Sequence, residues 1–143
     1  MKNKTLLLFT LFHATLILIG CKKKTEIDVD KKKYLTSKSW KIAQVDKNVS
    51  TNPKGKIVYY PGDCLDYTYQ FKENGVLNII KDDPNNCFLS KQDDVVGTYN
   101  LADKELKYEG RIYKILEITP NQIKFYIDAP TSADYNSVVY LLE

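Results

Sequence analysis

The feature that most constrains this fold is a two-residue alternation of apolar and polar side chains. The segment "DYTYQF" places Tyr67, Tyr69 and Phe71 on one face and polar side chains on the other, as a half-buried β-strand requires. Gly75 then provides a turn residue that tolerates positive φ, and "VLNIIK" begins a return strand. This part of the chain is therefore predicted to be a β-hairpin that ends near Lys81.

The same alternation continues through the second half of the chain, in "DVVGTYNL" and "QIKFYID". The residues that share the apolar faces of these two segments are Val95, Gly97, Tyr99, Leu101, Ile123, Phe125 and Ile127. From Trp40 onward about eight or nine short strands follow one another, with turn signals between them. No segment after Ser39 has the period of a long amphipathic helix. The sequence thus predicts an all-β, antiparallel fold, either a barrel or a sandwich.

The arrangement of these strands favours the barrel. Consecutive hairpins indicate an up-and-down meander rather than a Greek key. The segment "RIYKILEI" carries apolar residues on both faces, with Ile112, Leu116 and Ile118 expected on one side and Tyr113 and Ile115 on the other. A small barrel with a filled interior and a partly covered exterior accommodates such strands.

The N-terminal residues are typical of a secretory signal. Lys2 and Lys4 precede a short run of Leu, Ile and Phe that is too short to span a membrane. The residues Leu18 to Cys21, "LIGC", resemble a bacterial lipobox. The resemblance implies cleavage after residue 20 and acylation of Cys21, and two or more acyl chains anchor a protein stably.

Residues 21–33 follow the signal and are predicted to form a lipidated, flexible tether, because they are charged and poor in core-forming side chains. Asp30 is expected to cap a short helical turn that reaches Leu35. Residues 34–143 are predicted to form one domain.

Removal of the signal changes what the composition means. The net charge of +3 includes Lys2 and Lys4, so the mature chain is nearly neutral and offers no support for nucleic-acid binding. His13, the one histidine, is also removed, which excludes histidine-based catalysis and metal binding. In an exported protein Cys64 and Cys87 are expected to form a disulfide that contributes about 3 kcal/mol. Two free thiols are the alternative.

Several of these segments together resemble a known family. "LTSKSWKIAQV" (35–45), "DCLDYTYQFKENGVLNI" (63–79), Cys87, "VVGTYNL" and "LKYEGRIYKILEITPNQIKFYI" are similar to the lipocalin-like domains of bacterial envelope lipoproteins. The resemblance extends from Leu35 to Glu143. It implies an eight-stranded up-and-down β-barrel in which a helical turn precedes Trp40 and the Trp40 ring closes one end. The residue before Trp40 is Ser39, where lipocalins proper usually have glycine.

The sequence offers no catalytic or metal-binding residues. The carboxylate pairs Asp82–Asp83 and Asp93–Asp94 flank turns, and neighbouring strand residues point to opposite faces. No G-x-S-x-G motif is present. The chain is therefore expected to be non-enzymatic and to need no cofactor.

The abundant tyrosines suit the lining of a partly hydrated cavity, because a tyrosine ring is apolar and its hydroxyl is polar. The predicted ligand-binding residues are Tyr67, Tyr69, Phe71, Tyr99 and Phe125, and the predicted ligand is a small apolar or amphipathic molecule. The lysines that follow Cys21 favour an outer-membrane anchor that faces the periplasm. A protein-interaction module, such as an assembly accessory or a periplasmic enzyme inhibitor, is the alternative; it would expose a loop near 53–63. A carboxylate enzyme is a third hypothesis.

Overall fold

The structure is a computed structural model that describes residues 23–62, 66–82 and 93–143. Most of its regular elements are strands, which confirms the all-β prediction. Its elements, in chain order, are helix α2 (Lys23–Thr36), β1 (Trp40–Lys41), the 3₁₀ helix η1 (Val49–Thr51), β2 (Ile57–Tyr59), β3 (Asp66–Phe71), β4 (Val76–Asp82), β5 (Val95–Asn100), β6 (Glu105–Tyr108), β7 (Arg111–Ile118), β8 (Ile123–Asp128) and β9 (Ser137–Leu142).

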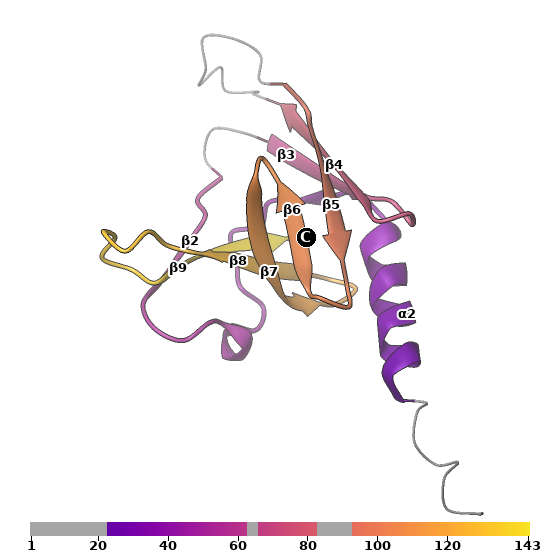
Figure 1. Ribbon diagram of the computed structural model, residues 1–143, viewed down its shortest axis with the longest axis horizontal. Coiled ribbons are helices and arrows are strands. Elements are labelled where there is room, and N and C mark those ends of the chain that lie inside the picture. The colour runs from indigo at the N-terminus through magenta and orange to yellow at the C-terminus, as the bar shows by residue number, and fades with distance from the viewer. Residues whose placement is uncertain (1–22, 63–65, 83–92) are drawn as a thin grey trace, which may run out of the picture.

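The strands form one curled sheet of nine strands in the order β1-β3-β4-β5-β6-β7-β8-β9-β2 (Figure 1). From β3 to β9 every strand pairs antiparallel with the next, which confirms the predicted meander. The exception is β2, which pairs parallel with β9. The sequence pattern did not predict this pairing, because a parallel neighbour leaves no mark on local alternation.

The first strand contacts β3 and β9, the strands at the two ends of the meander. In β1, Trp40 pairs with Tyr69 of β3. Lys41 exchanges two backbone hydrogen bonds with Glu143, at 3.0 and 2.9 Å, and the Ala43 N–H donates to the Leu141 carbonyl at 2.8 Å. Backbone hydrogen bonds therefore connect β3, through the first strand, to the end of β9.

The predicted hairpin is formed by β3 and β4, with Tyr69 opposite Ile79. Gly75 lies in the turn with a φ of 84°, a conformation that glycine adopts without steric cost. The Tyr99 N–H donates to the Gly75 carbonyl at 2.8 Å, so β5 also contacts this turn. The predicted turn and its glycine are confirmed.

A β-bulge in β7 changes one predicted face. The pairing with β8 shifts in register between Ile115 and Glu117. Tyr113 and Ile115 share the buried face, but Ile118 is also buried, whereas Ile112 is exposed. The prediction that Ile118 shares a face with Ile112 was wrong, because the extra residue of a bulge reverses the alternation beyond it.

The core lies inside the curled sheet and is rich in aromatic rings. Its fully buried large side chains include Trp40, Tyr69, Leu77, Leu106 and Phe125. The alternating residues of β5 and β8 contribute as predicted, since Gly97, Tyr99, Ile123 and Phe125 are buried and Val95, Leu101 and Ile127 are partly buried. The two-residue period therefore identified these inward faces correctly.

Helix α2 is longer than the predicted helical turn. It begins at Lys23, so Asp30 lies inside the helix instead of capping it, and residues 23–33 of the segment predicted as a flexible tether are helical. Lysine and glutamate are good helix formers, and the last turn packs against the sheet. There Leu35 is fully buried, and its carbonyl accepts a hydrogen bond from Trp40 Nε1 at 2.9 Å.

Several predicted features lie outside the described residues. They are the secretory signal (1–20), the acylated Cys21 and the two cysteines of the predicted disulfide, Cys64 and Cys87. The lipid anchor and the disulfide remain predictions. Among the described residues, no helix has the length and apolar character needed to cross a membrane.

Candidate functional site

The five predicted ligand-binding residues all lie inside the curled sheet. Tyr69, Phe71 and Phe125 are at most 4% exposed and are surrounded by other rings. The centroids of Tyr69 and Phe125 are 6.2 Å apart, and those of Phe71 and Tyr99 are 5.4 Å apart. Tyr67 is half-buried. These rings contribute to the packed core, and their predicted role in ligand binding stays a prediction.

A cluster of five rings forms the centre of this core, and we call it the ring cluster: Tyr69, Tyr108, Tyr113, Phe125 and Tyr140. Tyr108 and Tyr113 are stacked with centroids 4.2 Å apart, and Phe125 and Tyr140 are stacked at 5.1 Å. Tyr69 and Tyr113 each meet Phe125 edge to face. Such pairs stabilise a core beyond the area they bury.

Burial raises the pKa of several tyrosines in and beside the ring cluster. For Tyr108, burial is the main cause and the neighbouring hydroxyl of Tyr69 adds to it. Burial also raises the pKa of Tyr69 and of Tyr140. The cause is the same in each case, because an anion is poorly solvated among packed rings.

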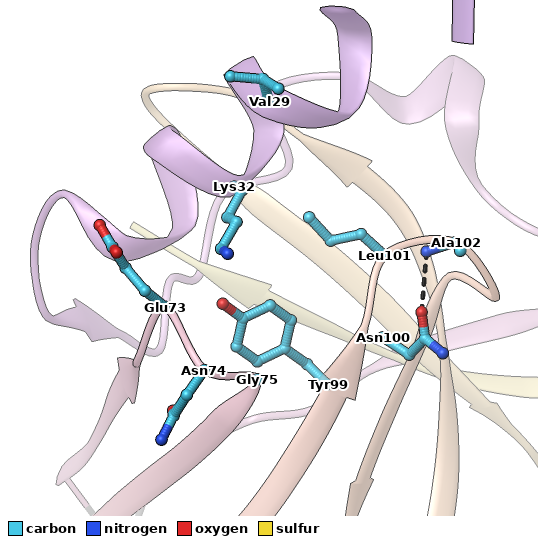
Figure 2. Close-up of a pocket in the computed structure, with 9 residues that line it drawn as sticks. All are labelled: Val29, Lys32, Glu73, Asn74, Gly75, Tyr99, Asn100, Leu101 and Ala102. Atoms are coloured by element: carbon cyan, nitrogen blue, oxygen red, sulfur yellow. Dashed lines mark hydrogen bonds between the residues drawn. The ribbon is translucent and has the colours of Figure 1, made fainter. Parts of the chain in front are cut away.

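An open groove between helix α2 and two strand turns has the size of a small-molecule site, with a volume of about 510 Å³. Val29 of the helix, Tyr99 at the end of β5 and Leu101 and Ala102 of the β5–β6 turn form its apolar walls (Figure 2). The β3–β4 turn closes another side with Glu73, Asn74 and Gly75. Tyr99 is the residue of the predicted set that lines this groove.

Polar side chains also line this groove. Figure 2 shows Lys32 extending from the helix toward the hydroxyl end of the Tyr99 ring. That hydroxyl donates to the Lys72 carbonyl at 2.6 Å, which fixes the ring. Burial, followed by the nearby Glu73 carboxylate, raises the pKa of Tyr99. Besides its apolar walls, the groove therefore offers the Tyr99 hydroxyl, the Lys32 ammonium group, the Glu73 carboxylate and the amides of Asn74 and Asn100.

A second buried cluster lies on the outer face of the sheet, around Lys124 of β8. The Lys124 side chain is completely buried, and its ammonium group forms an ion pair with Asp46 Oδ1 at 2.7 Å. It also donates to the Asn48 carbonyl, and to Thr51 Oγ1 and Asn52 Oδ1 at 3.0 Å each. We call these five residues the Lys124 cluster. They hold the loop that contains η1 against β8.

Asp46 is held in its ionised form. Burial alone would raise its pKa, but hydrogen bonds from Lys124, the Asn48 N–H and the Tyr59 hydroxyl outweigh burial and lower it. The Tyr59 hydroxyl donates to Asp46 Oδ2 at 2.8 Å. Every oxygen of this carboxylate thus has a donor, as a buried charge requires.

Sequence reasoning missed both the groove and the Lys124 cluster. Lys124 lies between Ile123 and Phe125, so the alternation assigned it to a solvent-facing position. Its oxygen ligands come from 46–52, more than 70 residues away in the chain. The abundance of hydrogen-bonding side chains in "DKNVSTN" is a signal for a structured loop, but it does not identify the partner. The groove depends on helix α2, which was predicted from the sequence only as a short helical turn.

No group of three or more His, Cys, Asp or Glu residues in the described part of the chain could hold a metal ion. Comparison with protein-family models, with curated proteins and with solved structures finds no match to this chain. The groove and the curled sheet are therefore the observations on which a function can be argued.

Proposed function

We propose that this protein is a non-enzymatic, lipid-anchored, lipocalin-like β-barrel that binds a small apolar or amphipathic molecule in the groove beside helix α2. The observation that carries the proposal is the groove itself. Its volume of about 510 Å³ falls within the usual range for small-molecule sites, and its walls are mainly apolar. The Tyr99 hydroxyl, fixed by its hydrogen bond to the Lys72 carbonyl, and the Lys32 ammonium would orient the ligand.

The curled sheet supports the barrel. The eight strands β1 and β3–β9 follow one another in the order of an up-and-down barrel, with β2 as an additional strand. Hydrogen bonds between Lys41 and Glu143 and between Ala43 and Leu141 link the first of these strands to the last. Closure of this kind removes unpaired strand edges. Trp40, fully buried beneath the last turn of α2, suits a residue that closes one end.

The anchor rests on the resemblance of the residues around Cys21 to a lipobox. Acylation there would hold the protein at the outer membrane, facing the periplasm, with helix α2 immediately beyond the acylated residue. Growth of the host with radiolabelled palmitate tests this: the protein should be labelled, and the Cys21→Ser variant should not. An unlabelled wild-type protein would rule out the anchor.

The ligand is best sought by native mass spectrometry of the protein purified from its own host. A bound small molecule should be observed, and it should be lost from the Ala102→Trp variant, whose indole would fill the groove. Ala133→Trp, in the β8–β9 loop, is the matched control and should retain the molecule. Equal retention by both variants would place the ligand elsewhere, and retention by neither would show that the effect is not specific to the groove.

One observation favours the alternative of a protein-interaction module. Val96 and Ile112 are exposed on the outer face of the sheet, by 74% and 52%, and together line an open hollow of about 430 Å³. Exposed apolar groups of this kind occur at protein interfaces. Cross-linking in intact cells, from positions 96 and 112, should capture a protein partner if this alternative holds.

A further inference from the structure

Five lysines gather around helix α2 and the two turns that face it. Lys31, Lys32 and Lys33 belong to the helix, Lys72 to the β3–β4 turn and Lys104 to the β5–β6 turn. Lys32 and Leu101 line the groove, while Lys31, Leu101 and Lys104 line an adjoining cavity of about 170 Å³. Lys33 follows Lys32 on the helix, and Lys72 precedes Glu73 of the groove wall. We call these five residues the lysine face.

The five lysines of the lysine face have no carboxylate partners among the described residues. None of their ammonium groups forms an ion pair there, and Lys72 donates to the neutral Gln70 side chain at 3.4 Å. Away from α2, Lys56 pairs with Asp134 at 2.8 Å, Lys114 with Asp128 at 2.8 Å, and Lys81 with Glu109. Many of the other surface lysines are thus paired, although Lys38, which lies over the Trp40 ring, and Lys54 also form no ion pair among the described residues.

Acidic groups near the lysine face are fewer than its lysines. Asp30 lies on the helix, Glu73 in the groove, Asp103 in the β5–β6 turn and Glu117 in the cavity that Lys31 and Lys104 line. Asp103 accepts a hydrogen bond from Asn100 at 2.6 Å, and it forms no ion pair among the described residues. The five lysines outnumber these four carboxylates, which leaves a small excess of positive charge beside the helix.

We propose that the lysine face rests on a bilayer surface that contains anionic phospholipids, with its ammonium groups at the lipid phosphates. The inference rests on the proposed function in one respect: acylation of Cys21 would place the start of helix α2, at Lys23, beside the bilayer. Lysines next to an anchor are attracted to anionic headgroups, and each contributes to binding within a Debye length of the surface.

The consequence is a fixed orientation. Lys32 of the lysine face lines the groove beside α2 (Figure 2), so the groove would face the lipid surface, and its ligand would enter from there. The β8–β9 loop, with its Lys56–Asp134 pair, would point away. Exposed Val29, in the groove wall, would lie close to the headgroups.

The test is sedimentation of the unacylated chain with lipid vesicles. The protein begins at residue 21 and carries Cys21→Ser, and it retains every described element because these begin at Lys23. It should bind vesicles that contain phosphatidylglycerol more tightly than vesicles of phosphatidylcholine alone, and added salt should weaken binding. The Lys31→Glu/Lys32→Glu variant should bind at least about tenfold more weakly.

Lys54→Glu/Lys56→Glu is the matched control, since it makes the same change of charge at two neighbouring lysines that precede β2, separated by one glycine. It should bind within about twofold of the parent protein. Circular dichroism verifies folding, and Lys72→Glu/Lys104→Glu repeats the test outside the helix. Equal losses in the test and control variants, equal binding to both kinds of vesicle, or no binding to either would overturn the inference. Palmitate labelling and the ligand search are separate measurements, so failure of the proposed function would be distinguishable.

Discussion

The ring cluster and the Lys124 cluster both have buried centres, yet they are buried for opposite physical reasons. The ring cluster excludes water because its aromatic rings are apolar and pack against one another, and it would tolerate some change in detail. The Lys124 cluster encloses an ammonium group and a carboxylate, which are costly to desolvate and depend on every partner being present. The comparison shows that one sheet can carry an apolar core on its inner face and an ionic one on its outer face.

The largest expected effect is on the Lys124 cluster. Lys124→Met should lower the free energy of unfolding by about 3–5 kcal/mol, because it leaves the Asp46 carboxylate enclosed without its cation. Urea denaturation measures the change. Lys114→Met, which breaks the exposed pair with Asp128, should cost at most about 1 kcal/mol. Similar losses for the two variants would mean that burial does not distinguish these ion pairs.

The second-largest loss of stability is expected in the ring cluster, when a neighbouring side chain is enlarged. Gly97→Ala adds a methyl group that would lie 2.8 Å from Tyr108 Cβ and would also meet the Lys107 carbonyl. Overpacking of this kind costs about 1–3 kcal/mol, again measurable by urea denaturation. Thr98→Ala, at the exposed neighbour on the same strand, should change stability by no more than about 0.5 kcal/mol. If Gly97→Ala proved equally neutral, the close approach of β5 and β6 would not be required.

High pH should weaken the ring cluster. Burial raises the pKa of Tyr69, Tyr108 and Tyr140 above the ordinary value of 10.0, so above about pH 10 the folded state keeps protons that the unfolded state loses. Stability is therefore complete below that pH and falls as pH rises. The absorbance of ionised tyrosine should show that these residues titrate only as the chain unfolds. Their titration in a chain that remains folded would contradict the packed ring cluster.

The smallest effect concerns one carboxylate at low pH. The pKa of Asp46 is lowered from the ordinary 3.8, so the folded state binds fewer protons than the unfolded state just below that pH. This contribution to stability is present above pH 3.8 and is lost as pH falls through the lower, folded pKa. Urea midpoints over this range should fall less steeply for Asp46→Asn than for the parent. Parallel curves would show that Asp46 does not carry the dependence.

Much of the ring cluster could be predicted, whereas the Lys124 cluster could not. The alternation through Tyr69 and Phe125 is a local property, since each strand residue has an inner or outer position set by its immediate neighbours. Burial of Lys124 depends on a loop far away in the chain, and the same alternation marks Lys124 as exposed. Strand β7 could be predicted only in part. The strand itself was predicted correctly, but the reversal at Ile118 depends on pairing with β8.

The sequence by itself determined the antiparallel strands of this protein, the β3–β4 hairpin with Gly75 at its turn, and the inward faces of β5 and β8. These follow from spacing along a few neighbouring residues, which fixes side-chain direction in an extended chain. Only the tertiary structure decided the parallel pairing of β2 with β9, the enclosure of Lys124 and the groove between α2 and Leu101. Each of these needs surfaces that are distant in the chain to meet, and a local period carries no information on which surfaces they are.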